Sequence, residues 1–105
     1  MFVVVLQYVQ PLPVIDQALD AHRAFLDRQY AAGLFLASGP LVPRTGGVIL
    51  ATGVSRPALE TVLGEDPFAQ AHLAEYQIHE FQPTRAAVGA EVLLSQEVAT
   101  TAESR

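Results

Sequence analysis

The apolar residues of this chain recur with two different periods, which predict strands and helices in turn. Phe2 to Val9 is rich in β-branched and aromatic residues on both faces, as is typical of a strand buried on both sides. From Pro13 to Ala32 the apolar residues recur at helical spacing, and Gly33 follows where a helix ends. This segment is predicted to be the longest helix.

The middle of the chain predicts two strands and a second, shorter helix. Leu34–Ala37 and Val48–Thr52 are short apolar runs joined by a loop that contains Pro, Arg and a Gly-Gly pair. Ser55 is a good N-cap and Pro57 suits a first helical turn, so a helix is predicted over Arg56–Leu63.

A further short turn starts at Asp66-Pro67, and Glu75–Phe81 alternates as a half-exposed strand. The element order β-α-β-β-α-β indicates an α+β protein with the ferredoxin-like fold, a four-stranded antiparallel sheet whose first and third strands are central. Helices reach only one face of such a sheet. Because the first strand is apolar on both faces, we expect a partner's sheet to cover the other face, in a homodimer or a higher even oligomer.

Length and composition limit the chain to one domain. The chain has 105 residues, half of them hydrophobic and only 16% charged, which also favours an apolar interface with another copy. We expect the domain to span residues 1–85, followed by a C-terminal extension over residues 86–105. In that extension Ala86–Leu94 is apolar enough to pack as a helix or strand, and Ser95–Arg105 is polar and expected to be mobile.

The charged and reactive residues exclude several classes of function. The net charge is −5 and the six basic residues are scattered arginines, which argues against nucleic-acid binding. Without lysine or cysteine, Schiff-base chemistry, thiolate chemistry and disulfides are absent. The apolar start has no basic residues and is too short to span a bilayer, so we expect a cytoplasmic protein with no membrane partner.

His22 is the first candidate for chemistry. Around the predicted helix it lies within about 40° of Ile15 and Leu26, in the middle of the apolar stripe, so it points at the sheet. There a ring nitrogen is able to accept a proton near neutral pH. The alternative is a core histidine whose nitrogens are bonded to backbone groups.

Asp66 is the second candidate. Asp followed by Pro67 is what a helix start prefers, so capping alone explains it. The two roles are compatible, because a carboxylate that receives N–H donors from a helix start also suits orienting an imidazole and stabilising its cation.

Four more residues are candidates for substrate binding. Ser38 and Gly39 offer a hydroxyl and a close backbone approach, although an ordinary turn by itself explains them. Tyr8 is either a ligand-facing phenol or core packing. Arg44, in a mobile loop with Thr45–Gly47, would grip an anionic substrate or be a solvated hairpin arginine.

Metal and cofactor sites are not expected. His72 and His79 are seven positions apart, which matches no compact pair of metal ligands. The sequence also lacks a Gly-rich phosphate loop, a G-x-S-x-G elbow and an H-E-x-x-H motif. What remains is chemistry by protein side chains alone.

The order of several short motifs resembles the YCII-related proteins. The motifs run from Met1 to Phe81 and are an apolar first strand, the helical His22 followed by Phe25-Leu26, the run Gly33–Pro40, Asp66-Pro67-Phe68 and the run Tyr76–Phe81. The most specific are the spacing of the helical histidine, the A/S-G-P after the second strand and the D-P-F before the last strand.

The resemblance implies a ferredoxin-like fold of the dimeric α/β-barrel superfamily, in which two sheets pack face to face. It also implies an active-site pair at His22 and Asp66, with Ser38 in the same pocket. One branch of the family is similar to a dehydrochlorinase of chlorinated hydroxyhydroquinones. This chain departs from the pattern in having Glu80 where basic residues are frequent and a longer tail after Pro83.

Two functions follow from these observations. The first is a small enzyme without cofactor in which His22 and Asp66 perform acid–base chemistry, an elimination or isomerisation, on a small aromatic or lactone-like molecule. The second is a non-catalytic module that binds a small molecule or serves dimerisation, with His22 as a hydrogen-bonding or core group.

Overall fold

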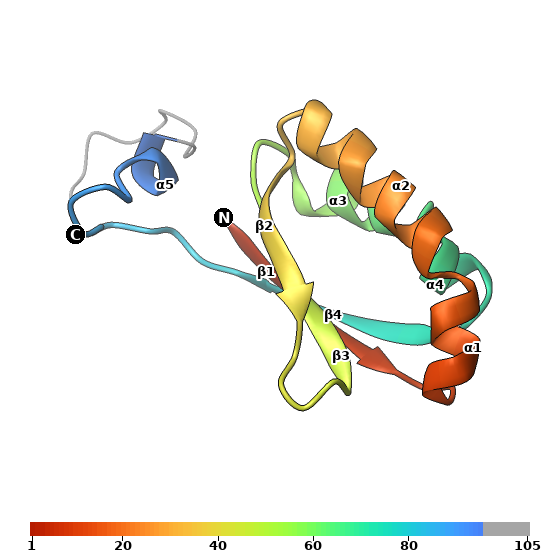
Figure 1. Ribbon diagram of the computed structural model, residues 1–105. Coiled ribbons are helices and arrows are strands. Elements are labelled where there is room, and N and C mark those ends of the chain that lie inside the picture. The colour runs from red at the N-terminus through yellow and green to blue at the C-terminus, as the bar shows by residue number, and fades with distance from the viewer. Residues whose placement is uncertain (96–105) are drawn as a thin grey trace.

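The computed structural model describes residues 1–95 and folds them into a four-stranded sheet with helices on one of its faces (Figure 1). The strands are β1 (Phe2–Tyr8), β2 (Phe35–Pro40), β3 (Gly46–Ala51) and β4 (Ala74–Glu80). Their order in the sheet is β2-β3-β1-β4, and every neighbouring pair is antiparallel. The predicted ferredoxin-like α+β fold, with the first and third strands in the centre, is confirmed.

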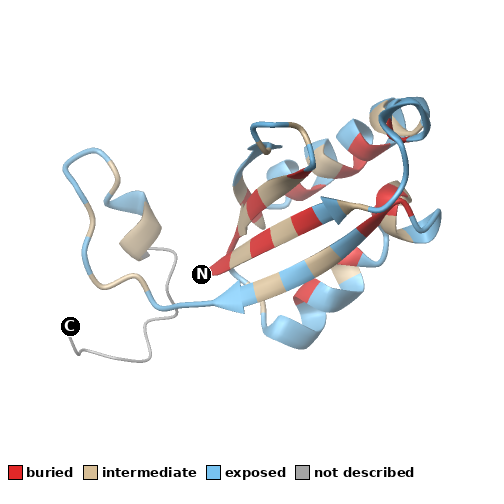
Figure 2. Ribbon diagram, turned by 90° about the horizontal axis from the view of Figure 1, so that it is seen from below, coloured by how far each residue is buried: buried red, intermediate tan, exposed pale blue. Residues whose placement is uncertain are grey.

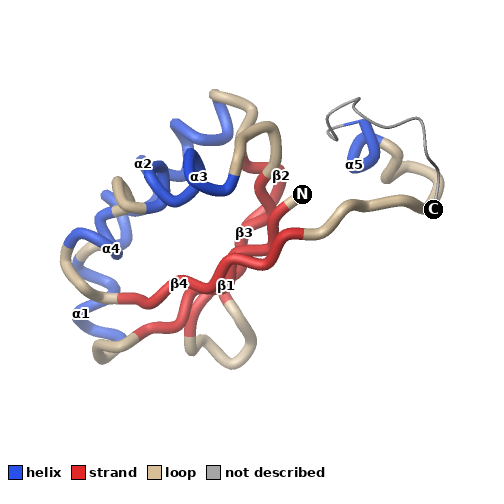
Figure 3. The backbone as a smooth tube through the Cα atoms, turned by 180° about the vertical axis from the view of Figure 1, so that it is seen from behind, coloured by secondary structure: helices blue, strands red, loops and turns tan. Residues whose placement is uncertain are grey.

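The helices are α1 (Leu12–Gln17), α2 (Leu19–Ala31), α3 (Arg56–Leu63), α4 (Pro67–Gln70) and α5 (Val92–Ser95). The first four lie on the same side of the sheet, whereas α5 lies apart from both layers (Figure 3). Within residues 1–95, no helix combines the length and the apolar character that crossing a bilayer requires.

Helix ends follow the signals in the sequence. The Ser55 hydroxyl caps α3 by accepting from the Ala58 N–H at 3.3 Å, as expected of an N-cap. After α2, Gly33 takes a φ of 79°, and the N–H groups of Gly33 and Leu34 bond back to two carbonyls of the last turn. This is the Schellman arrangement, in which glycine meets the left-handed conformation without steric cost.

The single helix predicted over Pro13–Ala32 is wrong in one respect, because it is divided at Ala18 into α1 and α2. The N–H of Ala18 bonds to the Ile15 carbonyl three residues back, so the chain makes a tighter turn there. Ile15 and His22 nevertheless both remain buried on the side that faces the sheet. Periodicity identifies the buried face but not this break.

The second and third strands are longer than predicted. Ser38 and Gly39 belong to β2 and do not form a turn, and Gly46 and Gly47 belong to β3 and not to the loop. A bulge at the start of β2 shifts its register, so that Ser38 pairs with Ile49 and shares its helix-facing side.

Glycine is required at the start of β3. A Cβ at Gly46 would lie 1.8 Å from the Leu6 carbonyl oxygen, so the close approach of β1 and β3 tolerates no side chain there. The Gly-Gly pair thus sets strand packing, although it resembles a flexible loop in the sequence.

The two faces of β1 are buried to different degrees, as the alternating colours along this strand show (Figure 2). Phe2, Val4 and Leu6 face the helices and are fully buried in the core. Val3 and Val5 face the other way and are half-buried, opposite Leu50 and Val48 of β3.

The side of the sheet away from the helices is therefore apolar at its centre. We call it the open face and define it by Val3, Val5, Val48 and Leu50. The partner sheet expected there stays a prediction.

After β4 the chain leads away from the sheet (Figure 1). Between Ala86 and Leu94 the structure has the start of α5 and, in the part described, no strand. The side chain of Val88 is 98% exposed. The domain boundary predicted after residue 85 stays a prediction. The segment Ser95–Arg105 is expected to be mobile, and its residues 96–105 lie outside the described residues.

Candidate active site

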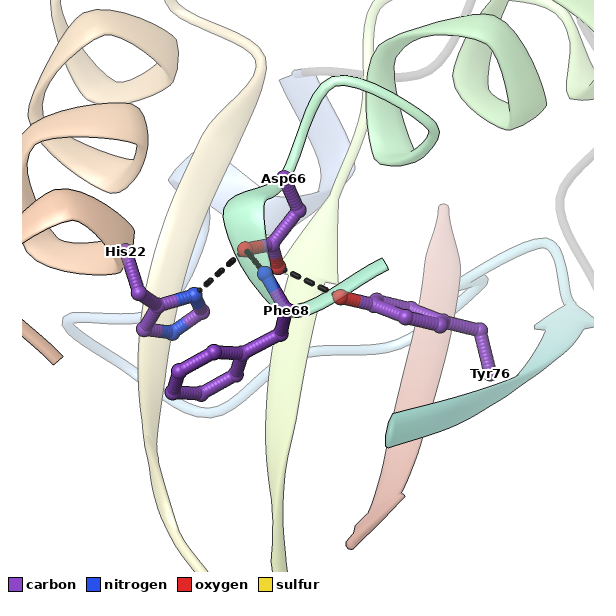
Figure 4. Close-up of polar contacts among 4 residues, drawn as sticks. All are labelled: His22, Asp66, Phe68 and Tyr76. Carbon is purple, nitrogen blue, oxygen red and sulfur yellow. Dashed lines mark hydrogen bonds and ion pairs between the residues drawn. The ribbon is translucent and has the colours of Figure 1, made fainter. Parts of the chain in front are cut away.

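The structure brings the two main candidates into direct contact. His22 comes from α2 and Asp66 from the turn before α4, 44 positions later, and His22 Nδ1 lies 2.8 Å from Asp66 Oδ1 (Figure 4). His22 is 9% exposed and Asp66 is 0% exposed. Hence the imidazole is turned inward from its helix to meet a fully buried carboxylate.

Asp66 also caps α4. Its Oδ1 accepts from the Phe68 N–H at 3.0 Å, and Pro67 occupies the first turn. The same carboxylate oxygen therefore serves the helix start and the histidine, so that capping and orienting the imidazole coexist in one side chain.

A third donor, Tyr76 of β4, completes the surroundings of Asp66. Its hydroxyl donates to Asp66 Oδ2 at 2.6 Å. Burial first, and then the charge of Asp66 and its hydrogen bond, raise the pKa of the Tyr76 phenol far above its ordinary value. Sequence reasoning missed this residue: the alternation of the last strand puts Tyr76 and Ile78 on the same face, but nothing in the sequence placed Tyr76 beside Asp66.

Phe68 fixes the plane of the histidine ring. The two rings are stacked, with centroids 3.9 Å apart and planes inclined by 3° (Figure 4). An aromatic face also attracts a cation, so the Phe68 ring would stabilise the His22 ring when it carries a positive charge. Tyr8 packs against the edge of Phe68 at a centroid distance of 6.0 Å.

The contacts of Asp66 determine the tautomer of His22. Carboxylate oxygens only accept hydrogen bonds, so Nδ1 carries the proton and donates. Among residues 1–95 no partner is recorded for Nε2. Since no buried side-chain nitrogen or oxygen in that part of the chain lacks a partner, Nε2 must reach accessible space as a free acceptor.

That space is a pocket of about 280 Å³ between α2 and the sheet. Its walls are largely apolar and include Leu6, Leu19, Leu26 and Ile49. It is smaller than the pockets that hold drug-sized ligands, and its size and walls suit a molecule of about one ring.

The predicted site residues gather at this pocket. Tyr8, His22, Ser38, Gly39 and Arg44 all line it, whereas Asp66 does not, because it is buried and bonded to the pocket residue His22. Arg23 also lines the pocket, and sequence reasoning did not single it out. The roles of these residues in catalysis and binding stay predictions.

The polar groups at the pocket's edge are each paired with a residue of a helix. Ser38 Oγ lies 2.6 Å from the hydroxyl of Tyr30 on α2. Arg44 donates to Asp16 of α1 at 2.6 Å, and this hydrogen bond is the main cause that raises the pKa of the guanidinium. The loop that we expected to be mobile is therefore tied to α1.

Metal ligands do not come together in the described residues, where no three His, Asp or Glu side chains form a group able to hold an ion.

Similarity to known proteins gives the family and the fold of this chain. The model of the YCII-related domain family matches residues 1–82, and no curated protein matches the sequence. Among solved structures the chain is similar to 5-chloro-2-hydroxyhydroquinone dehydrochlorinase (TftG) from Burkholderia phenoliruptrix AC1100, in complex with 2,5-dihydroxybenzoquinone. The TM-score is 0.65 and the identity 20%, over 77% of this chain and 93% of the other, so the likeness establishes the fold.

Proposed function

This chain belongs to the YCII-related family, whose model matches residues 1–82 of 105, and we propose that it is a small enzyme that performs acid–base chemistry without a cofactor. One observation carries the proposal: the buried carboxylate of Asp66 binds Nδ1 of His22, so that Nε2 of the same ring is free to accept a proton in the pocket. In this arrangement His22 is the base and Asp66 orients it.

In an elimination, Nε2 takes a proton from an O–H or C–H of the substrate. The electron pair left behind forms a new double bond, and the leaving group departs with the electrons of its own bond. In an isomerisation, the imidazolium returns the proton to another atom of the substrate. In both cases the buried carboxylate and the stacked Phe68 ring stabilise the imidazolium while it exists.

The pocket supports a substrate of about one ring, a hydroxylated aromatic or lactone-like molecule. Apolar walls would hold the ring, and Ser38 and Arg44 would hold its oxygens. The ligand bound in the structure of the similar dehydrochlorinase, 2,5-dihydroxybenzoquinone, is such a molecule, and 5-chloro-2-hydroxyhydroquinone, after which that enzyme is named, is the first substrate to test on this chain.

We also propose that two copies pair through the open face. The half-buried Val3, Val5, Val48 and Leu50 would be covered by the same residues of the partner's sheet. Light scattering should then give twice the 11.3 kDa mass of one chain, and Val5→Glu should reduce it to one copy. A single copy at every concentration would contradict this pairing.

The decisive experiment offers 5-chloro-2-hydroxyhydroquinone to the protein and measures chloride release. We expect turnover by the unmodified protein and a rate about 10²- to 10⁴-fold lower for His22→Ala. The control is His72→Asn, which removes an exposed imidazole outside the pocket and keeps a residue that tolerates the φ of 56° there.

Equal rates of turnover for His22→Ala and the unmodified protein would contradict the role of His22 as the base. Binding without turnover, across this compound and a panel of hydroxylated aromatics and lactones, would favour the non-catalytic module.

A further inference from the structure

We propose that Tyr76 is a positioning residue of this site, whose hydroxyl orients the Asp66 carboxylate and through it the catalytic imidazole. This rests on the proposed function of His22 as a base, and it assigns a third member to the array, one that never touches the substrate.

The carboxylate needs a donor on each of its oxygens. Oδ1 receives His22 Nδ1 at 2.8 Å and the Phe68 N–H at 3.0 Å, whereas the hydrogen bond recorded for Oδ2 is that of Tyr76 at 2.6 Å. The torsion that turns a carboxylate about its own axis is broad, so contacts at one oxygen leave its plane poorly fixed. A short bond at the other oxygen removes that freedom.

Tyr76 is well placed to act as a fixed point. It lies in β4 opposite Leu6 of the central strand, so its backbone is part of the sheet and not of a loop. His22 and Asp66, by contrast, lie on a helix and in a turn. The hydrogen bond of Tyr76 thus ties the helix layer, at the site, to the sheet.

The hydroxyl can only donate in this role. Burial and the neighbouring carboxylate raise the pKa of Tyr76, so it keeps its proton at neutral pH and well above it. Tyr76 is therefore unsuited to be a second acid or base and suited to be a permanent donor.

The ring of Tyr76 also shields the carboxylate. Tyr76 lines a second hollow of about 250 Å³, together with Leu63, Ala69 and Ile78, on a different side from the substrate pocket. Asp66 does not border that hollow and is 0% exposed. Its charge is consequently directed at His22 and not screened by solvent.

Tyr76→Phe tests the proposal, with Tyr30→Phe as matched control. Each variant removes one tyrosine hydroxyl and one bond of 2.6 Å, but Tyr30 bonds to Ser38 and not to Asp66. In Tyr76→Phe we expect the His22 Nδ1 proton, followed by NMR, to exchange with solvent about three- to tenfold faster, since one hydrogen bond is lost. With 5-chloro-2-hydroxyhydroquinone, kcat should fall by a similar factor while KM is unchanged. Tyr30→Phe should leave the exchange of the His22 proton as it is.

If the His22 Nδ1 proton exchanges at the same rate in Tyr76→Phe and Tyr30→Phe, the positioning role of Tyr76 is overturned. If Tyr76→Phe does not fold, the unmodified protein still decides: the Tyr76 hydroxyl proton should be slow to exchange and visible, and it should disappear in Asp66→Asn. A Tyr76 hydroxyl proton that exchanges as fast as that of Tyr30 would overturn the proposal as well.

These experiments also distinguish a failure of the proposed function of His22 from a failure of the positioning role of Tyr76. If His22→Ala retains turnover, the role of His22 as the base is wrong, whatever Tyr76 does. If His22→Ala loses turnover but Tyr76→Phe behaves as Tyr30→Phe does, only the positioning role falls.

Discussion

The inner end and the outer edge of the pocket are built differently. At the inner end one fully buried carboxylate receives donors from α2, α4 and β4. At the edge, Ser38 is hydrogen-bonded to Tyr30 and Arg44 to Asp16, and both hydrogen bonds are exposed. The guanidinium of Arg44 also lies over the ring of Tyr8, 5.9 Å from its centroid.

This difference separates two tasks. Buried hydrogen bonds in a low dielectric are strong and costly to break, so the inner end holds one geometry and suits chemistry. Exposed pairs contribute little and exchange readily with other partners, so the edge suits recognition of a substrate's oxygens. The predictions below test this division between a fixed inner end and an exchangeable edge.

The largest expected effect is the loss of the inner carboxylate. Asp66→Ala leaves the donors of His22, Phe68 and Tyr76 buried without an acceptor, and we expect the free energy of unfolding to fall by about 3–5 kcal/mol. Asp16→Ala removes the partner of Arg44 at the edge and should cost far less. Urea unfolding of both variants measures the difference, and similar losses would refute the contrast.

Alkaline pH should weaken the inner end selectively. The pKa of Tyr76 is raised in the folded protein, so above about pH 10 the unfolded chain loses a proton that the folded chain keeps. Stability should then decrease as pH rises, by up to about 1.4 kcal/mol per pH unit from this group, and should be unaffected by it below about pH 9.

Denaturant unfolding between pH 8 and pH 11.5 tests this slope. Tyr76→Phe should reduce it, while Tyr30→Phe should keep the part that Tyr76 contributes. An identical slope in Tyr76→Phe and the unmodified protein would show that the phenol does not stay protonated in the fold.

Loss of the Phe68 ring that stacks on His22 should have a smaller effect on the free energy of unfolding. Phe68→Leu keeps most of the buried volume but loses the parallel ring at 3.9 Å, with an expected cost of about 0.5–1.5 kcal/mol. Phe35→Leu is the control, because Phe35 is equally buried but packs against Phe25 and Tyr30. Only Phe68→Leu should move the NMR signals of the His22 ring, and equal shifts in both variants would contradict the stack.

At the edge, Arg44→Gln should change recognition and hardly change stability. The guanidinium is half-buried and paired with an exposed carboxylate, so its loss should leave the melting temperature nearly as it was. Binding of an anionic hydroxyquinone should weaken, while a neutral lactone should bind as before. Calorimetric titration with both ligands checks this, and equal losses for both would argue against a charge contact.

The sequence predicts the fold where local signals and burial agree. Helix α3 has the predicted bounds, because Ser55 and Pro57 mark its start. Strand β1 is recognisable because it is central in the sheet and carries apolar residues on both faces.

Prediction from the sequence fails where a contact between distant segments decides the structure. The bulge in β2 and the strand character of Gly46 depend on the approach of neighbouring strands, which no local pattern records. In the site, the inward side of His22 was predictable from helical spacing, but its meeting with Asp66 rested on the family resemblance. Tyr76 escaped because alternation gives the face of a strand and not its neighbours.

The central claim is that Asp66 holds His22 with its proton on Nδ1 and leaves Nε2 as the base. The most direct test is NMR of the ring nitrogens of His22 in ¹⁵N-labelled protein near neutral pH. The structure predicts a protonated Nδ1 and an unprotonated Nε2 in the neutral ring, and a mixed or reversed pattern in Asp66→Asn. A neutral ring that carries its proton on Nε2 in the unmodified protein would contradict the account.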